Sequence, residues 1–159
     1  MVPYPVSTVV RLTMKTDSDH IRSWETMVRC VRTPAFVNWP DVLDPGRLDA
    51  VVSVLDWYPT LTRLAGATID RSSALEGQDV WPLLSGQAKP SPRTLYWKTG
   101  QGAAVRRGEW KLVVDHRSSQ TELFDLSQDP NERENLAFKA PERLKQMLML
   151  LAEQSALDP

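Results

Sequence analysis

The sequence has a single cysteine, Cys30, among its 159 residues. One thiol excludes a disulfide within the chain and indicates no redox compartment. An excess of charge of one sign is also lacking, because 19 lysine and arginine residues nearly balance 20 aspartate and glutamate residues. A net charge of −1, with no basic stripe interleaved with aromatics, lacks the electrostatic signature of a nucleic-acid-binding protein. We therefore expect no nucleic acid partner.

Long hydrophobic runs are absent as well. The most apolar stretch near the start, residues 6–12, is too short and too polar for the core of a signal peptide or for a membrane span. The sequence therefore predicts no membrane span and shows no signal peptide. Hydrophobic residues still make up 42% of the chain, which at this length is enough to bury one core.

A strand and a helix are predicted in the first half of the chain. Residues 35–39 are a compact apolar run that ends at Pro40, which predicts a buried strand. Ser53 and Asp56 have the spacing of a capping box, and the apolar residues after them recur at helical intervals. Gly66 is placed to end this helix in a left-handed conformation.

An antiparallel sheet is predicted in the second half, followed by a helix. Its four strands are expected at residues 94–98, 103–106, 110–114 and 121–126, with Arg107-Gly108 as the turn between the second and third. Alternation along the third strand places Trp110, Leu112 and Val114 on one face, and Lys111 and Val113 on the other. Pro141 begins the last helix. The stripe expected to cover the sheet is Leu144, Met147, Leu148 and Leu151.

Four segments carry motifs in a distinctive order. They are VRTPAFVNWP at 31–40, SVLDWYPTLTRLAG at 53–66, LEGQDVWPLLSG at 75–86 and ELFDLSQDPNERENL at 122–136. The last string can be read as an ordinary strand and turn, but the four together resemble the C-terminal motifs of type I sulfatases, arylsulfatases among them. The resemblance implies the α/β fold of the alkaline-phosphatase-like superfamily. We expect a remnant of its large doubly wound sheet, then a small α+β part in which four antiparallel strands pack on a C-terminal helix.

The resemblance also implies a chemistry whose residues this chain lacks. A type I sulfatase uses a formylglycine made from the first residue of Cys/Ser-x-Pro-x-Arg, and a calcium ion held by an Asp-Asp and an Asp-Asn pair. The chain has no such pairs, and its two similar spacings place Leu43 and Lys139 in the position of the nucleophile. Neither side chain can form an aldehyde. We therefore expect no catalytic residue, no metal ligand and no cofactor in this chain itself.

The beginning of the chain does not resemble the family. Val28-Arg29-Cys30 stands where sulfatases have Glu-Gly-Gly, and the likeness starts at Val31. We interpret this as a truncated or frame-shifted reading frame, with a divergent N-terminus as the alternative. The expected organisation is an atypical segment at 1–30, a remnant of the catalytic domain with its connection at 31–93, and the C-terminal subdomain at 94–159. Sulfatases are commonly periplasmic, lysosomal or secreted, and nothing in this chain selects among these compartments.

Two side chains are candidates for contact with a substrate. Lys98 lies in a strand that the resemblance places near the pocket, where a cation would suit an anionic sulfate ester. His116 follows Asp115 and precedes Arg117, which suggests acid–base chemistry. The alternatives are a solvent-facing strand lysine and a solvated loop histidine. A third basic group, formed by Arg106, Arg107 and Lys111, is interpreted as a solvated turn.

Three functions are consistent with these features. The first is the C-terminal part of a sulfatase whose whole chain hydrolyses sulfuric esters, with this part inactive alone. The second is a fragment of a related phosphodiesterase or phosphonate hydrolase, which the resemblance places in the same superfamily. The third is a non-catalytic module that binds anionic glycans or a partner subunit. Because strand 35–39 and the first helix would lack their neighbours, we expect an exposed apolar patch that includes Phe36, Trp39, Trp57 and Leu61 and allows self-association.

Overall fold

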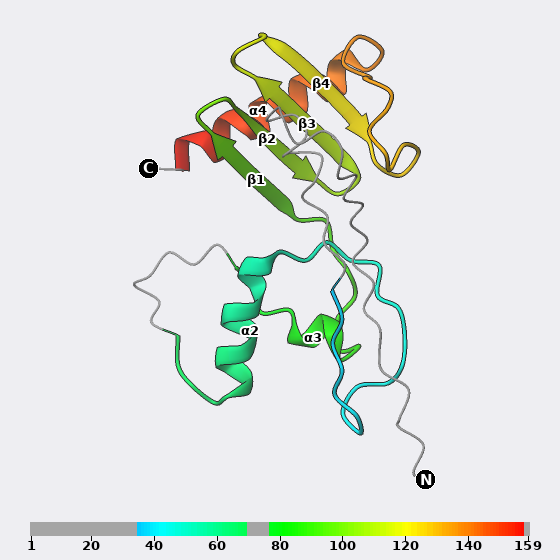
Figure 1. The fold of residues 1–159 in the computed structure, drawn as a ribbon, viewed down its shortest axis with the longest axis vertical. Helices are drawn as coiled ribbons and strands as arrows, with labels where there is room; N and C mark the ends of the chain where they lie inside the picture. Colours follow the sequence, from blue (N-terminus) through cyan, green and yellow to red (C-terminus); the bar gives the residue numbers. More distant parts are fainter. Residues whose placement is uncertain (1–34, 70–76, 158–159) are drawn as a thin grey trace, which may run out of the picture. The chain divides into compact units, whose positions relative to one another are not determined.

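A computed structural model describes residues 35–69 and 77–157, which divide into two compact units (Figure 1). In the described chain, one unit extends to Ser91 and the other begins at Pro92. The segment 1–30, which the sequence sets apart, lies outside the described residues. Among the described residues, no helix is long and apolar enough to span a bilayer.

The first unit is built on a helix whose predicted ends are confirmed. A short 3₁₀ turn, η1 (Val54–Asp56), leads directly into α2 (Trp57–Leu64). Ser53 caps the start, because its backbone N–H donates to Asp56 Oδ2 at 2.7 Å and its hydroxyl accepts from the backbone N–H of Leu55 at 3.3 Å. Gly66 follows the helix with a φ of +70°, the left-handed conformation that glycine adopts at low cost.

The predicted buried strand at 35–39 is wrong. Only Ala35 takes part in a bridge, and the residues after it are irregular. Phe36 and Trp39 are exposed, at 64% and 43% of their surfaces. The apolar run has the composition of a strand from a parallel sheet, but such a strand is stable only when both faces are covered. The described residues contain no strand beside it, since their only sheet is in the second unit.

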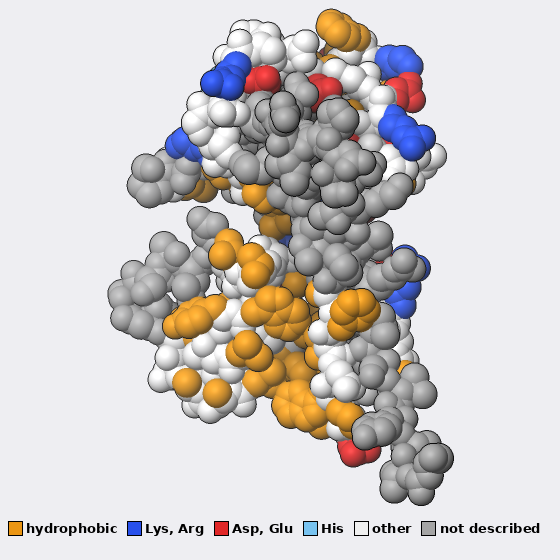
Figure 2. Space-filling model, in the orientation of Figure 1, with side chains coloured by type: hydrophobic (Ala, Val, Ile, Leu, Met, Phe, Trp, Pro, Cys, Tyr) orange, Lys and Arg blue, Asp and Glu red, His pale blue; other side chains and the backbone are white. Residues whose placement is uncertain are grey.

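The first unit also leaves much of α2's apolar side uncovered. Val54, Tyr58 and Leu61, spaced as one helical stripe, are all exposed, whereas Trp57 is half-buried. Figure 2 shows hydrophobic side chains gathered on the face of this unit. The expected exposed patch is therefore present, with Trp57 only partly in it. A four-residue helix that the sequence did not predict, α3 (Trp81–Leu84), completes the unit.

The second unit is a four-stranded sheet covered by a helix, as predicted. Its strands are β1 (Thr94–Thr99), β2 (Gly102–Arg107), β3 (Trp110–Asp115) and β4 (Gln120–Asp125). They pair antiparallel in the order β1-β2-β3-β4. The turn between β2 and β3 is Gly108-Glu109, one residue later than expected, because Gly108 supplies the positive φ of +60° there.

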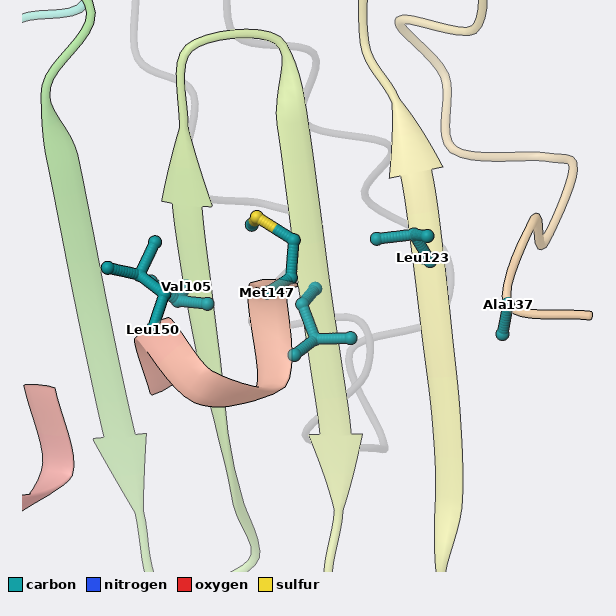
Figure 3. Close-up of a cluster of buried hydrophobic side chains, with 6 residues drawn as sticks. Val105, Leu123, Ala137, Met147 and Leu150 are labelled. Carbon is teal, nitrogen blue, oxygen red and sulfur yellow. The ribbon is translucent and has the colours of Figure 1, made fainter. Parts of the chain in front are cut away.

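Helix α4 (Pro141–Leu157) covers one face of this sheet. Figure 3 shows Val105, Leu123, Met147 and Leu150 directed toward one another between the helix and the strands. Leu112 belongs to this cluster, and Trp110 and Val114 pack against it, so the predicted alternation along β3 is confirmed. The opposite face buries Ala104, Val113 and Phe124 in a separate cluster.

One residue of the predicted helix stripe is wrong. Leu148 is 40% exposed, and Leu150, which the pattern omitted, is 8% exposed and lies in the core. Met147 is a helical neighbour of Leu150, three residues on, and also of Leu151, four residues on. Several apolar residues in succession therefore leave the buried side of this helix ambiguous from spacing alone.

These two leucines provide a matched test of the helix orientation. Leu150→Ala should lower the free energy of unfolding by about 2–4 kcal/mol, because it removes buried contacts and leaves a cavity. Leu148→Ala should change it by less than about 1 kcal/mol. Chemical denaturation followed by circular dichroism measures both. Equal losses from the two variants would contradict the packing described here.

Candidate functional site

The string at 122–136 forms a turn that is held closed by its own side chains. Asp129 Oδ2 accepts hydrogen bonds from the backbone N–H groups of Arg133 at 2.5 Å and Glu134 at 2.8 Å. These donors, that of Glu134 foremost, hold the pKa of Asp129 below its ordinary value of 3.8. The carboxylate thus serves as the acceptor for these two N–H groups. Pro130, next in the chain, restricts the backbone direction.

Asn135 of the same string covers the outer edge of the sheet. Its Oδ1 accepts from the backbone N–H of Leu123 at 3.0 Å and of Ala137 at 2.9 Å, and its Nδ2 donates to the carbonyl of Thr121 at 3.1 Å. The backbone N–H of Leu136 adds a bond to the carbonyl of Leu123 at 2.8 Å. Since β4 is an edge strand, these bonds satisfy backbone groups that would otherwise be open to pairing with another chain.

A buried ion pair joins this turn to the sheet. Lys111 Nζ, on β3, lies 2.8 and 2.7 Å from the two carboxylate oxygens of Glu132, and each side chain is only 4% exposed. Glu132 has a φ of +55°, a conformation that a residue with a side chain rarely adopts. The interpretation of Lys111 as part of a solvated basic turn is therefore wrong, although Arg107 is exposed as expected.

The sequence contains one signal of this pair. Strand alternation placed Lys111 on the same face as Val113, which is a buried face. A lysine there requires a carboxylate partner, because a single charge is too costly to bury. Glu132 was available in the turn after β4, but no rule of spacing connects two residues that far apart in the chain.

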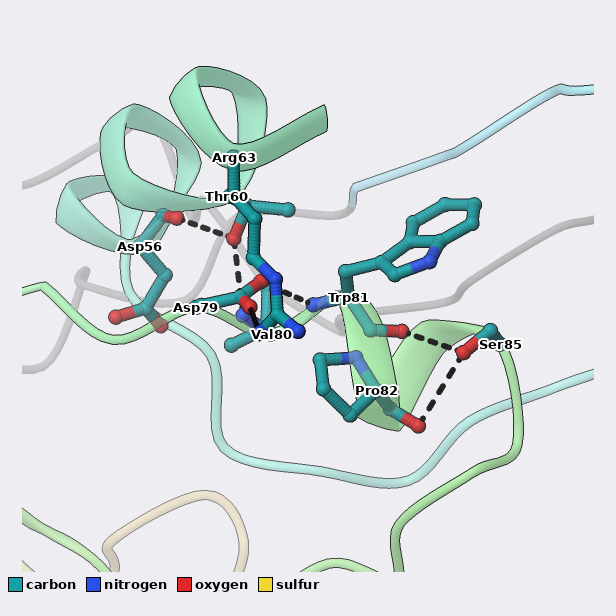
Figure 4. Close-up of polar contacts among 8 residues, drawn as sticks. All are labelled: Asp56, Thr60, Arg63, Asp79, Val80, Trp81, Pro82 and Ser85. Carbon is teal, nitrogen blue, oxygen red and sulfur yellow. Dashed lines mark hydrogen bonds and ion pairs between the residues drawn. The ribbon is translucent and has the colours of Figure 1, made fainter. Parts of the chain in front are cut away.

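In the first unit, two motifs bind each other through Asp56 and Thr60 (Figure 4). Asp56 is fully buried and its Oδ1 accepts from the backbone N–H of Gln78 at 2.9 Å. The Thr60 hydroxyl donates to the carbonyl of Asp56 at 2.6 Å and accepts from the backbone N–H of Val80 at 2.9 Å. Polar side chains at the end of η1 and on α2 thus bind the segment that leads into α3.

Gly77 and Asp79 complete this contact. A Cβ atom on Gly77 would lie 2.1 Å from the carbonyl oxygen of Leu55, so no other residue fits without movement of the backbone. Asp79 Oδ1 accepts from the backbone N–H of Trp81 at 2.9 Å, and its Oδ2 pairs with Arg63 Nη1 at 2.5 Å. These motif residues therefore have partners within the unit.

The two candidate substrate contacts lie at the same end of the four-stranded sheet. Lys98 is exposed on β1, and its register partner Ala103 pairs in turn with Val114 on the face that α4 covers. His116 is exposed just after β3, and its backbone N–H donates to the carbonyl of Gln101 at 2.9 Å. That bond ties the β1–β2 and β3–β4 turns together and so fixes this end of the sheet.

The two segments spaced like a nucleophile motif, 43–47 and 139–143, make structural contacts. Leu43 is buried, and Arg47 pairs with Asp49 at 2.8 Å. Lys139 pairs with the exposed Glu134. The Arg143 guanidinium lies 5.0 Å from the centre of the Trp110 ring, within the range of a cation–π contact. No nucleophile is positioned at either place.

The described side chains do not fit a calcium site. Across residues 35–69 and 77–157, no three histidine, cysteine, aspartate or glutamate side chains gather at one point. Calcium requires six or more oxygen ligands that converge. The carboxylates of Asp56 and Asp129 accept backbone hydrogen bonds instead. We assign no chemical step through a metal to these residues.

A family model for the C-terminal part of N-sulphoglucosamine sulphohydrolase matches residues 25–156. The chain belongs to the sulfatase family. Bovine (Bos taurus) arylsulfatase A is 35% identical over 160 residues, which cover 79% of this chain and 31% of that protein. Mouse (Mus musculus) steryl-sulfatase is 30% identical, over 74% of this chain and 24% of its own length. The chain therefore spans about a quarter to a third of these sulfatases and matches their C-terminal portion, as the motifs predicted.

Solved structures agree with this assignment. The crystal structure of Ps i-CgsB matches 78% of this chain with a TM-score of 0.66 and 27% identity, over 29% of its own chain. The same protein in complex with k-i-k-neocarrahexaose gives a TM-score of 0.65. The expected fold, a small antiparallel sheet with a C-terminal helix within an alkaline-phosphatase-like sulfatase, is confirmed.

The buried ion pair predicts a large loss of stability when one partner is removed. Lys111→Met should lower the free energy of unfolding by about 3–5 kcal/mol, because Glu132 would be left buried without its cation. Lys139→Met, which removes an exposed pair on the same unit, should change it by less than about 1 kcal/mol. Urea denaturation measures both. A Lys111→Met variant as stable as Lys139→Met would show that the buried pair contributes nothing.

The lowered pKa of Asp129 predicts a dependence of stability on pH. Its folded pKa lies below its unfolded pKa, so the ionised carboxylate stabilises the fold above about pH 4, and the effect is lost as pH falls through the folded pKa. Asp129→Asn should therefore lower the free energy of unfolding at pH 7 by about 1 kcal/mol. The difference from the parent should shrink toward pH 3. Glu153→Gln, an exposed substitution in α4, is the control that should show no such trend.

Proposed function

We propose that this chain is the C-terminal part of a sulfatase that hydrolyses sulfuric esters, and that it has no such activity by itself. The observation that carries this proposal is that the motif residues stabilise the fold of this chain. Asp56, Gly77, Asp129 and Asn135 each lie in a family motif, and each serves a hydrogen bond or a close backbone approach within its own unit. They build a scaffold, and the described side chains include no nucleophile placed for attack on sulfur.

The organisation that we propose follows the sequence. Residues 31–93 correspond to the end of a catalytic domain with its connection, and residues 94–159 to the C-terminal subdomain. Formylglycine and calcium, which the family implies, would belong to the part of the enzyme that precedes them. They would supply the nucleophile and the charge that stabilises the sulfate oxygens. The role of the present chain is to complete the enzyme around that site.

Lys98 and His116 are the proposed substrate contacts within this arrangement. Both are exposed at one end of the sheet, which the backbone bond between His116 and Gln101 holds fixed. A lysine ammonium at such a position suits the oxygens of a sulfate ester. The substrate of the whole enzyme is accordingly proposed to be a sulfate ester.

A binding module for anionic glycans is the second candidate. What supports it is the similarity to Ps i-CgsB, a protein that was solved in complex with k-i-k-neocarrahexaose. The candidate requires that Lys98 and neighbouring cations bind a glycan without the rest of an enzyme. It ranks second because the cationic cluster that the sequence offered, at Arg106, Arg107 and Lys111, has Lys111 buried in a pair with Glu132.

The proposal predicts that the purified chain is inert. With calcium and a chromogenic aryl sulfate, it should release no more product than buffer does, because no nucleophile is available. Bovine arylsulfatase A in the same assay is the positive control. Saturable hydrolysis that disappears when a residue of this chain is substituted would overturn the proposal. Retention of the chain on a sulfated-glycan column, lost in Lys98→Met, would favour the binding module.

A further inference from the structure

Helix α2 exposes an apolar stripe, unlike an ordinary surface helix. Its buried residues are Pro59 and Thr60, and Asp56 just before it is buried as well; Asp56 and Thr60 are bonded to the segment at 77–80. The side that it exposes is apolar, and it carries Tyr58 and Leu61. A surface helix normally places its charged and polar side chains in water and its apolar stripe against the core. The stripe of α2 is therefore shaped for contact with a further layer of protein.

The extended segment at 35–39 lies in the same unit and has the same character. Its sequence is that of a strand for the interior of a parallel sheet, yet Phe36 and Trp39 are exposed. Trp39 contacts Trp81 with ring centres 5.3 Å apart, so the segment is packed on the unit from one side only. The helix stripe and the apolar segment at 35–39, both partly exposed, are the two kinds of surface against which a further α/β layer could pack.

We propose that this surface, which we call the α2 patch (Phe36, Trp39, Val54, Leu55, Tyr58 and Leu61), docks the N-terminal catalytic portion of a sulfatase. The inference rests on the proposed function, because it takes its partner from the sulfatase family. The choice of partner follows from the lengths of the relatives. The matched segment is only 31% of bovine arylsulfatase A and 24% of mouse steryl-sulfatase, and most of each chain lies outside it.

A second copy of this chain fits the patch less well. It would offer another helix stripe to α2, but the described residues contain no strand of the first unit whose edge could pair with segment 35–39. The catalytic portion of an α/β enzyme offers both a helix-covered layer and parallel strands. It satisfies the backbone groups of the segment as well as its apolar side chains.

The test is assembly in trans. Untagged full chain would be co-expressed with tagged bovine arylsulfatase A truncated before the segment that this chain matches, and in parallel with Ps i-CgsB truncated in the same way. The expected result is a one-to-one complex on the affinity resin and in gel filtration. Leu61→Asp should reduce recovery of the chain at least tenfold. Met149→Asp, on α4 and equally exposed at 58%, should leave recovery unchanged.

The outcomes separate this inference from the proposed function. Failure of both truncated proteins, each soluble and monodisperse in gel filtration without the chain, to retain it overturns docking through the α2 patch. Equal retention of the Leu61→Asp and Met149→Asp variants overturns it as well. A chain that sediments alone at twice its mass of 18.0 kDa, and as a monomer only with Leu61→Asp, shows a second copy as the occupant and also overturns it. Turnover plays no part in these readouts, so an inert chain that docks supports both proposals, whereas an active chain refutes only the proposed function.

Discussion

The buried pair of Lys111 and Glu132 is the constraint on which the second unit depends. Two opposite charges withdrawn from water must stay together, because either one alone would be far too costly to bury. The turn after β4 must therefore bring Glu132 back to Lys111 on the sheet. Glu132 accepts a left-handed backbone there, and Asp129 and Asn135 supply the hydrogen bonds that hold the turn in that shape. The family motif at 122–136 contains the residues that hold this turn against the sheet.

The first unit solves a similar problem without an ion pair. Asp56 is buried and accepts hydrogen bonds from the backbone N–H groups of Ser53, three residues before it, and of Gln78. Thr60 accepts from Val80, in the same segment as Gln78. Gly77 permits the close approach that brings those segments together. Motif residues in both units thus stabilise contacts between distant parts of the chain that helices and strands alone do not make. This explains how a family can be recognised from residues whose role is to hold the fold.

Local patterns in the sequence were sufficient for most of the fold. The capping box at Ser53, the alternation along β3 and Pro141 at the start of α4 each depend on neighbours within a few residues, and each was predicted. The ion pair between Lys111 and Glu132 joins residues far apart in the chain, and the backbone conformation of 35–39 depends on whether neighbouring strands are present, so neither followed from local patterns. Leu148 and Leu150 were exchanged because consecutive apolar residues fit two helix faces equally well. The positions of Lys98 and His116 at one end of the sheet required the strand register, which spacing alone does not fix.

The apolar stripe that α2 exposes has a consequence for the amount of the chain in a cell. Chaperones and proteases recognise exposed apolar stripes, and the steady-state amount of a protein reflects how long such surface stays visible to them. A helix that holds its aspartate inside cannot hide its tyrosine and leucine by rotating, since rotation would break the bonds of Asp56 and Thr60. The abundance of this chain should therefore follow the supply of whatever covers α2, much as an orphan subunit follows its complex.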